Sequence, residues 1–264
     1  MSTSPVIIIT GASSGIGAAT ARLFGREGYR VVITARRAER LQSLAQEIRS
    51  AGGEALPVRA DITRLDQIKN LVTAALDEFG QIDVLFNNAG FGHLGWLEEL
   101  DPVDDIDRQI QTNVMGVIQT TRSVLPHMIQ RRNGHIINMS SISGLIAPST
   151  YSVYAASKFA IRGFTEGLRR DMAGKGIHVS GIYPGSVTTE FSQHTGIESG
   201  TGFHTPKFLK LTAEKVAAAV LRLDRHPRRT VVIPWPMLVA VWGNILAPWL
   251  VDWVIESRFT RRRL

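Results

Sequence analysis

The sequence predicts an α/β protein with a doubly wound parallel sheet of about seven strands and helices on both faces. Short apolar runs alternate with longer amphipathic runs along the 264 residues. Such alternation with short connections is typical of parallel strands joined by right-handed helical crossovers. Residues 6–9 and 136–138 are apolar without polar alternation, as strands buried on both faces are. No linker, repeat or low-complexity tract interrupts the pattern, so we expect one domain over residues 1–264.

The short apolar runs and the longer amphipathic runs define the individual elements. The predicted strands are residues 6–10, 30–34, 55–60, 84–87, 134–140, 178–183 and 230–233. The predicted helices are residues 15–27, 38–51, 65–79, 103–130, 153–173 and 213–223. An apolar, helical C-terminal extension follows at residues 233–264.

Composition excludes several classes of protein. Hydrophobic residues make up 44% and charged residues 20% of the chain, so a large core is expected rather than disorder. The absence of cysteine excludes disulfides and thiolate metal or redox sites. With no basic leader and only a short apolar run near its start, the chain is expected in the cytoplasm. The net charge of +7 is scattered, which favours an anionic cofactor or membrane surface over nucleic acid.

A glycine-rich segment follows the first predicted strand and opens the first predicted helix. It reads Thr10-Gly-Ala-Ser-Ser-Gly-Ile-Gly17, with the spacing Gly-x-x-x-Gly-x-Gly. Glycines let a backbone approach a pyrophosphate, and a helix start offers free N–H groups and a positive dipole end. In this context the segment predicts a dinucleotide site rather than a flexible turn. The expected contacts are Gly11, Ser13, Ser14, Gly15, Ile16 and Gly17.

The end of the second strand indicates which dinucleotide is bound. Sites that prefer NAD usually place an acidic residue there for the ribose 2′-hydroxyl. This chain has Ala35 followed by Arg36 and Arg37. A guanidinium can bind a 2′-phosphate bidentately, so Arg36 predicts NADP. The alternative is that both arginines are solvated charges at a helix start.

Tyr154 and Lys158 lie four residues apart in a predicted helix and therefore share one of its faces. There the lysine ammonium can lower the pKa of the phenol from about 10. A phenol tuned in this way can donate or accept the proton that interconverts an alcohol and a carbonyl. Taken alone, the pair is also compatible with a half-exposed helix face.

Taken together, these motifs resemble those of the short-chain dehydrogenase/reductase family, in its compact single-domain branch with a Rossmann-type fold. The resemblance covers about residues 6–232. It rests on residues 10–17, Asp61, residues 87–90, Asn113, Ser141, Tyr154, Lys158, Pro184-Gly185 and Thr189.

The resemblance implies a role for each matched residue. Tyr154 would be the catalytic acid/base, Ser141 would hold the substrate oxygen, and the adjacent Ser140 is the rival for that role. Lys158 would lower the tyrosine pKa and bind the nicotinamide ribose, and Asn113 would hold a water that relays protons to Lys158. Asp61 would contact adenine. The other expected cofactor contacts are Ile62, Asn87, Ala89, Gly90, Pro184, Gly185, Val187 and Thr189.

These expectations describe an NADP-dependent oxidoreductase that acts on a carbonyl or alcohol of a largely hydrophobic substrate. Residues 186–211 would form a mobile lid, and apolar residues near the pocket favour that substrate class. Those apolar residues are Phe91, Leu145, Phe191, Phe203, Phe208 and Leu209. His93 and His194 could orient a polar group or be ordinary loop histidines. The alternative function is a catalytically idle NADPH-binding adaptor. The resemblance implies a homodimer or homotetramer.

The C-terminal extension departs from the minimal pattern of the family. Four of the five tryptophans lie between Trp235 and Trp253, and arginines follow from Arg258 to Arg263. Pro248 and Asp252 interrupt the apolar run, which disfavours a single membrane span. Tryptophans flanked by arginines suit peripheral contact with a membrane interface. Packing on the domain, or across a dimer, remains the alternative.

Overall fold

A computed structural model describes residues 4–190 and 209–259, with the backbone alone at residues 258 and 259. Seven parallel strands form one sheet in the order β3-β2-β1-β4-β5-β6-β9. Their bounds are β1 Val6–Thr10, β2 Arg30–Ala35, β3 Glu54–Arg59, β4 Val84–Asn87, β5 Gly134–Met139, β6 Ile177–Pro184 and β9 Thr230–Ile233. The strand order reverses between β1 and β4, where a doubly wound sheet opens a crevice for ligands.

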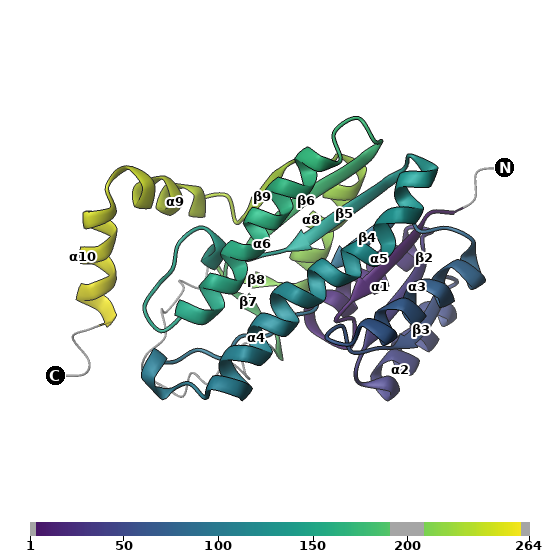
Figure 1. The fold of residues 1–264 in the computed structure, drawn as a ribbon, viewed down its shortest axis with the longest axis horizontal. Coiled ribbons are helices and arrows are strands. Elements are labelled where there is room, and N and C mark those ends of the chain that lie inside the picture. The colour runs from purple at the N-terminus through teal and green to yellow at the C-terminus, as the bar shows by residue number, and fades with distance from the viewer. Residues whose placement is uncertain (1–3, 191–208, 260–264) are drawn as a thin grey trace.

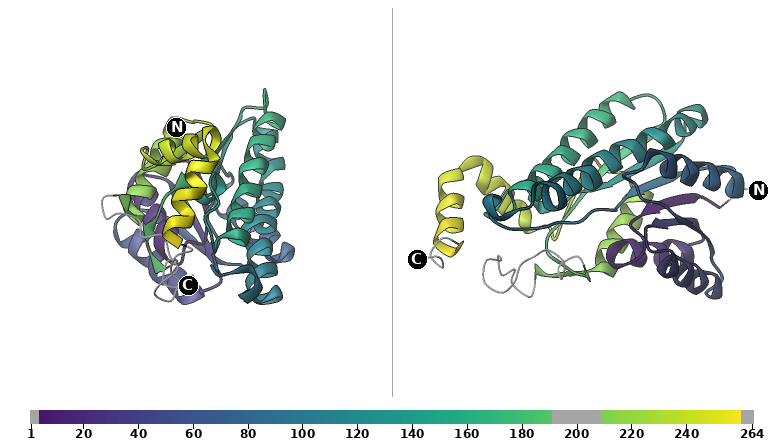
Figure 2. Two further views of the ribbon diagram at one scale, coloured as in Figure 1. Left: turned by 90° about the vertical axis from the view of Figure 1, so that its left-hand side faces the viewer. Right: turned by 60° about the horizontal axis from the view of Figure 1, so that its bottom comes forward.

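Helices cover both faces of this sheet, as Figures 1 and 2 show. One face packs against α1 (Gly15–Arg26), α2 (Ala38–Ser50) and α8 (Ala213–Arg225). The other face packs against α3 (Leu65–Phe79), α5 (Gly116–Arg131) and α6 (Ser152–Asp171). Every residue of β1 and β4 is buried, which explains why their sequences lack alternation. The predicted doubly wound architecture is confirmed.

The predicted helix at residues 103–130 is wrong in its detail. The chain is helical from residue 102 to 131, but two wide π-helical segments, Pro102–Asp107 and Gln111–Met115, lie on either side of the short α4 (Arg108–Ile110). Hydrophobic spacing does not distinguish such turns from α-helix, and π-turns are frequent at functional sites. The other predicted strands and helices end within a few residues of the observed bounds.

A second, two-stranded parallel sheet pairs β7 (Val187–Thr188) with β8 (Leu211–Thr212). Sequence patterns did not predict it, since each strand has only two residues. It ties together the two ends of the segment predicted to be a lid. Most of that segment, including Phe191, His194, Phe203 and Phe208, lies outside the described residues.

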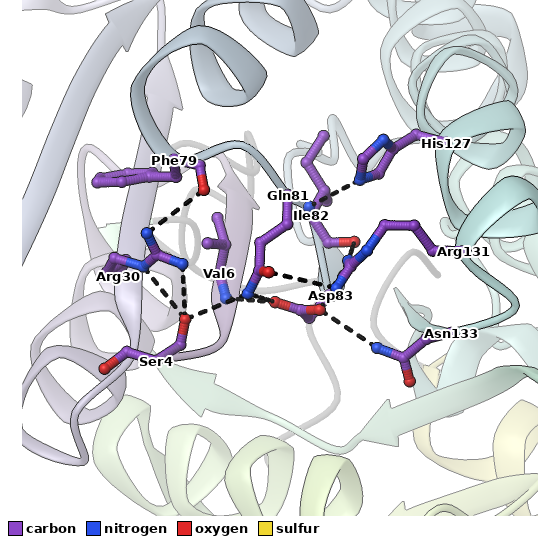
Figure 3. Close-up of polar contacts among 10 residues, drawn as sticks. All are labelled: Ser4, Val6, Arg30, Phe79, Gln81, Ile82, Asp83, His127, Arg131 and Asn133. Atoms are coloured by element: carbon purple, nitrogen blue, oxygen red, sulfur yellow. Dashed lines mark hydrogen bonds and ion pairs between the residues drawn. The ribbon is translucent and has the colours of Figure 1, made fainter. Parts of the chain in front are cut away.

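A polar cluster closes the amino edge of the sheet, opposite the ends where ligands bind in such folds (Figure 3). The Asp83 carboxylate accepts hydrogen bonds from the backbone N–H of Val6 (2.8 Å) and from Gln81 Nε2 (2.9 Å). Its other oxygen lies 2.9 Å from Arg131 Nη1 and 3.2 Å from Asn133 Nδ2. The carboxylate therefore joins β1, the loop before β4 and the end of α5.

Replacing Asp83, whose side chain is 12% exposed, with alanine is expected to destabilise the protein by about 2 kcal/mol, because Arg131 and the buried Val6 N–H lose their partner. The midpoint of thermal unfolding would fall by about 4–8 °C. Asp66→Ala is the matched control, since Asp66 is exposed and lies 3.6 Å from the equally exposed Arg64. Equal melting temperatures for both variants would contradict a structural role for this cluster.

After β9 the chain forms two short helices, α9 (Met237–Leu246) and α10 (Pro248–Phe259), which confirm a helical C-terminal extension. No single helix in the described ranges is long and apolar enough to cross a membrane. The pair Met237–Leu246 and Pro248–Ser257 meets that criterion only jointly, by length and composition, and bends by 117° at its break.

Candidate active site

The predicted catalytic residues gather at the carboxyl edge of β5. Ser141 follows this strand, and its Oγ accepts a hydrogen bond from the Ser143 N–H (3.1 Å). A second hydrogen bond joins the hydroxyls of Ser141 and Tyr154, which lies in the first turn of α6. The rival Ser140 instead donates its hydroxyl to the carbonyl of Lys158 (3.0 Å). Packing thus separates two adjacent serines that the sequence left as alternatives.

The pKa of Tyr154 differs from the sequence-based expectation. Its side chain is only 8% exposed, and burial raises the pKa of the hydroxyl well above 10 because a buried phenolate loses its hydration. The hydrogen bond with Ser141 lowers the pKa, and the charge of nearby Tyr151 raises it. The expectation that Lys158 lowers this pKa is therefore not met here: Tyr154 is a neutral phenol, the form that donates a proton.

Lys158 lies beneath the ring of Tyr154, with its Nζ 5.6 Å from the ring centre. The ammonium donates a hydrogen bond to the carbonyl of Met139 (3.2 Å) and is 4% exposed. Burial lowers the pKa of Lys158 to about 8, because the buried ammonium loses its hydration and no carboxylate of the described residues compensates that loss. The Lys158 ammonium therefore loses its proton as the pH rises past about 8, which is within the usual range of enzyme assays.

Asn113 is fully buried within the π-helical segment Gln111–Met115. Its Oδ1 accepts from the N–H of Phe91 (3.0 Å), and its Nδ2 donates to the Phe91 carbonyl (2.7 Å) and to Ser157 Oγ (3.1 Å). A side chain on Gly90 would lie 2.9 Å from Asn113 Oδ1. Asn113 therefore holds the loop after β4 against α6, although both of its partners, Phe91 and Ser157, are distant from it in the sequence.

The glycine-rich loop adopts a shape that only glycine permits at two points. Gly11 has φ +67°, and a Cβ there would meet the Ala89 backbone at 2.7 Å. A Cβ on Gly17 would lie 2.4 Å from the carbonyl of Gly11. Asn88 fixes this loop, since its Nδ2 donates to the carbonyls of Thr10 (2.9 Å) and Gly11 (3.3 Å). Steric contacts with neighbouring backbone therefore require glycine at these two positions of the motif.

A cleft of about 450 Å³ opens at the ends of β1, β2 and β4. Eight residues predicted to bind the cofactor line it: Gly11, Ser13, Ser14, Arg36, Asp61, Ile62, Ala89 and Gly90. The other eight lining residues were not among the expected cofactor contacts, although Ala35 and Arg37 entered the cofactor argument and Phe91 was expected near the substrate pocket. They are Thr34, Ala35, Arg37, Ala60, Phe91, Gly92, Thr112 and Glu190. Most of these residues are next in sequence to a predicted site residue, and this adjacency could have identified them from the sequence.

Arg37 bridges two parts of this cleft. Its guanidinium donates to Ser13 Oγ (2.9 Å) and Ser14 Oγ (2.8 Å) and lies 3.3 Å from Glu190 Oε2. Arg40 approaches Glu190 Oε1 at 2.7 Å. These arginines lower the pKa of the Glu190 carboxyl, chiefly through the hydrogen bond from Arg40. The glycine-rich loop, α2 and the segment after β7 thus meet at one rim.

The remaining predicted cofactor residues are not part of the lining of this cleft. Gly15 and Thr189 adjoin one another, because a Cβ on Gly15 would be 3.3 Å from the threonine side chain. Gly185 donates its N–H to the carbonyl of Ile233 (2.7 Å). Ile16 packs against the core, Pro184 ends β6, and Val187 pairs with Leu211.

Two of the predicted contacts have clear internal partners. The buried Asn87 donates to Thr121 Oγ1 (2.9 Å) and to Asn138 Oδ1 (2.9 Å), so its side chain braces β4. Asp61 Oδ1 accepts from the N–H and hydroxyl of Thr63 while the residue lines the cleft. Their contacts with a cofactor stay predictions. His93 lies 2.6 Å from Asp105, and the other predicted pocket histidine is outside the described residues.

A second polar constellation has the composition of a hydrolase triad. His135 Nε2 lies 2.8 Å from Ser180 Oγ, and its Nδ1 lies 3.0 Å from Asp224 Oδ1. Ser180 is a residue of β6 and is only 1% exposed, so its hydroxyl is inaccessible to a substrate. This group is a buried structural bridge to α8.

Comparisons with known proteins agree with this geometry. The family model described as short chain dehydrogenase matches residues 5–199. A 3-oxoacyl-acyl-carrier-protein reductase of Thermotoga maritima is 38% identical over 188 residues, covering 71% of this chain and 76% of the relative.

Two solved structures share the fold over nearly the whole chain. A short-chain dehydrogenase/reductase from Burkholderia phymatum in complex with NAD superposes with TM-score 0.84 and 28% identity, covering 95% of this chain and 96% of its own. A short-chain dehydrogenase from Sphingobium yanoikuyae in complex with NADPH has TM-score 0.80 and 27% identity, covering 94% and 96%. This chain belongs to the short-chain dehydrogenase/reductase family of oxidoreductases.

Proposed function

We propose that the protein is an NADP-dependent oxidoreductase that transfers a hydride between the nicotinamide and a carbonyl or alcohol of a largely hydrophobic substrate. The observation that carries the proposal is the hydrogen bond between the hydroxyls of Ser141 and Tyr154, with Lys158 beneath the tyrosine ring. Both hydroxyls belong to one small site at the carboxyl edge of the sheet. That edge is where doubly wound folds bind their ligands.

The residues around the cleft fit a phosphorylated dinucleotide. The glycine-rich loop leaves no space for side chains at Gly11 and Gly17, so backbone N–H groups at the start of α1 are accessible to a pyrophosphate. Arg36 and Arg37 line the adenosine side, where a 2′-phosphate needs cationic donors. Known relatives bind either form, since the Burkholderia protein holds NAD and the Sphingobium protein NADPH. The arginine pair favours NADP here.

When bound, the nicotinamide would supply or accept the hydride. The protein's part in reduction is to place the Ser141 and Tyr154 hydroxyls as donors to the substrate oxygen, where negative charge develops. Tyr154, a neutral phenol, then donates its proton to that oxygen. Lys158 would stabilise the resulting phenolate and, with a water held near Asn113, return a proton to it. Phe91 and Leu145 would contribute apolar surface to the substrate pocket.

Assembly into dimers or tetramers accompanies this proposal. Met115, Ile129 and Phe159 are exposed on the helical segments that carry Asn113 and Tyr154, and a second copy would cover them. These helices lie side by side on one face of the sheet, where a second copy could pack (Figure 1).

The direct test measures NADPH consumption against a panel of ketones, aldehydes, steroids and long-chain alcohols, with NADH in parallel. Turnover of at least one apolar carbonyl with NADPH is the expected result. Tight NADPH binding with no turnover across the panel would favour the idle adaptor.

Replacing Arg36 with aspartate is expected to lower kcat/KM for NADPH by about 10²-fold and to change the value for NADH little. The physical reason is that a carboxylate repels the 2′-phosphate but can accept a hydrogen bond from a free 2′-hydroxyl. Arg64→Asp, an equal charge change at an exposed site, is the control. Equal losses with both cofactors would contradict the assignment of Arg36 to the 2′-phosphate.

A further inference from the structure

The C-terminal helices carry an unusual concentration of exposed apolar side chains. Of sixteen large hydrophobic residues exposed in the described chain, ten lie between Trp235 and Val254. They are Trp235, Leu238, Val239, Trp242, Ile245, Leu246, Trp249, Leu250, Trp253 and Val254. Single exposed apolar residues are common, but a contiguous group of this size marks an interaction surface. We call these ten residues the tail surface.

The tail surface stands clear of the Rossmann domain but is anchored to it. Figures 1 and 2 show α10 at one end of the molecule, connected to the sheet only through α9 and β9. At the base of α9, the Met237 sulfur packs against Gly185, where a Cβ would lie 2.4 Å from it. Val251 packs against Gly243, which holds the two helices together. The helices thus form a defined projection whose exposed side chains are mostly apolar.

Few polar residues lie on the projection. Asn244, the one polar side chain of α9, is half-buried. On α10, the exposed Asp252 and Glu256 each follow a tryptophan by three residues, so they flank Trp249 and Trp253 on the same side of the helix. Exposed tryptophans are suited to the headgroup level of a membrane interface, where their rings contact both apolar and polar groups.

The charge of the C-terminal sequence favours a lipid surface over a second copy of the chain as the binding partner of the tail surface. The sequence ends in four arginines, Arg258 and residues 261–263, against only two acidic residues after Ile233. A second copy would bring an identical positive cluster to the same interface, which is repulsive. Anionic lipid headgroups attract such a cluster, by about 1 kcal/mol for each basic residue near the surface.

Helix length further restricts the mode of binding. The helices α9 and α10 have 10 and 12 residues, so each extends about 15–18 Å at 1.5 Å per residue. The hydrocarbon core of a bilayer is about 30 Å thick. Neither helix can span it, but both can lie within one interface.

We propose that the tail surface docks the protein peripherally onto an anionic phospholipid bilayer, with the tryptophans at the headgroup boundary and the net positive charge of the C-terminal sequence favouring anionic lipids. The strands of the seven-stranded sheet are parallel, so β9 ends at the same edge as β5, the strand that Ser141 of the candidate active site follows. Docking therefore brings the mouth of the substrate site toward the bilayer. The docking itself does not depend on the proposed reaction.

The test is flotation of the full-length protein with vesicles of phosphatidylcholine, with and without phosphatidylglycerol. We expect at least about tenfold more binding to the anionic vesicles at low salt, with a blue shift of tryptophan emission. The combined variant Trp242→Ser, Trp249→Ser and Trp253→Ser should lose about tenfold or more of this binding, because its interfacial anchors are gone. These side chains are 59%, 71% and 65% exposed, so folding should be unaffected.

Val103→Ser is the matched control, since Val103 is apolar and 62% exposed outside the tail surface. It should bind vesicles as the unchanged protein does. Absence of binding to anionic vesicles, or equal binding by the triple variant, would overturn the proposal. Sedimentation of both proteins without lipid tests the competing occupant: a dimer that the triple variant dissociates, with no vesicle binding, assigns the surface to a second copy.

Discussion

Replacing Tyr154 with phenylalanine is expected to lower kcat for carbonyl reduction by about 10³-fold, or about 4 kcal/mol in activation free energy. The variant keeps the ring that packs over Lys158 but removes the hydroxyl bonded to Ser141. Cofactor affinity should change little, because the phenol oxygen is needed chiefly for proton transfer. Steady-state kinetics on a confirmed substrate and a fluorescence titration with NADPH measure the two effects separately.

Tyr151→Phe provides the matched control for this prediction. The ring centres of Tyr151 and Tyr154 are 6.3 Å apart in an edge-to-face arrangement. Burial also raises the pKa of the Tyr151 hydroxyl. We expect this variant to retain most of its activity. A Tyr154→Phe protein that kept more than about a tenth of its turnover would refute Tyr154 as the general acid.

Replacing Lys158 with methionine is expected to abolish most activity and yet to stabilise the fold at neutral pH. The folded-state pKa of Lys158 is about 8, against 10.5 in the unfolded chain, so the unfolded state binds more protons between these values. The buried ammonium therefore costs stability in full below pH 8, and this cost disappears as the pH rises toward 10.5. A shift of this size corresponds to about 3 kcal/mol. Loss of the hydrogen bond to the Met139 carbonyl reduces this gain by about 1 kcal/mol, so the free energy of unfolding should rise by about 2 kcal/mol in all.

Chemical denaturation at pH 7, 9 and 10 tests the sign as well as the size of this effect. The stability advantage of Lys158→Met should be greatest at pH 7 and should narrow at each higher pH. Lys69→Met, at an exposed position on α3, should show no such trend. A variant less stable than the unchanged protein at pH 7 would show that the ammonium is well compensated in the folded state.

Stability and activity would then oppose each other at Lys158. A methionine fills the same space without a charge to desolvate, so the fold alone does not explain a lysine there. Buried charges that reduce stability are characteristic of functional sites.

The strand and helix pattern was predictable because its causes are local. Apolar runs such as residues 6–9 cannot be exposed, and the glycine-rich loop is dictated by steric contact at Gly11 and Gly17. The clustering of motifs at one edge follows from parallel strands, whose carboxyl ends share a side. The π-helical turns around Asn113 were not predictable, since they arise where its carboxamide pairs with the distant Phe91 backbone.

Chain order and residue type were therefore enough to establish the sheet, the location of the cleft and the glycine, tyrosine and lysine motifs. Three-dimensional packing settled finer questions: Ser141 rather than Ser140 faces Tyr154, the Asn87 side chain braces the sheet, and Arg37 joins Glu190 across the cleft rim. It also reversed the expected pKa shift of Tyr154. Burial and long-range hydrogen bonds caused these outcomes, and both depend on side chains brought together from distant parts of the sequence.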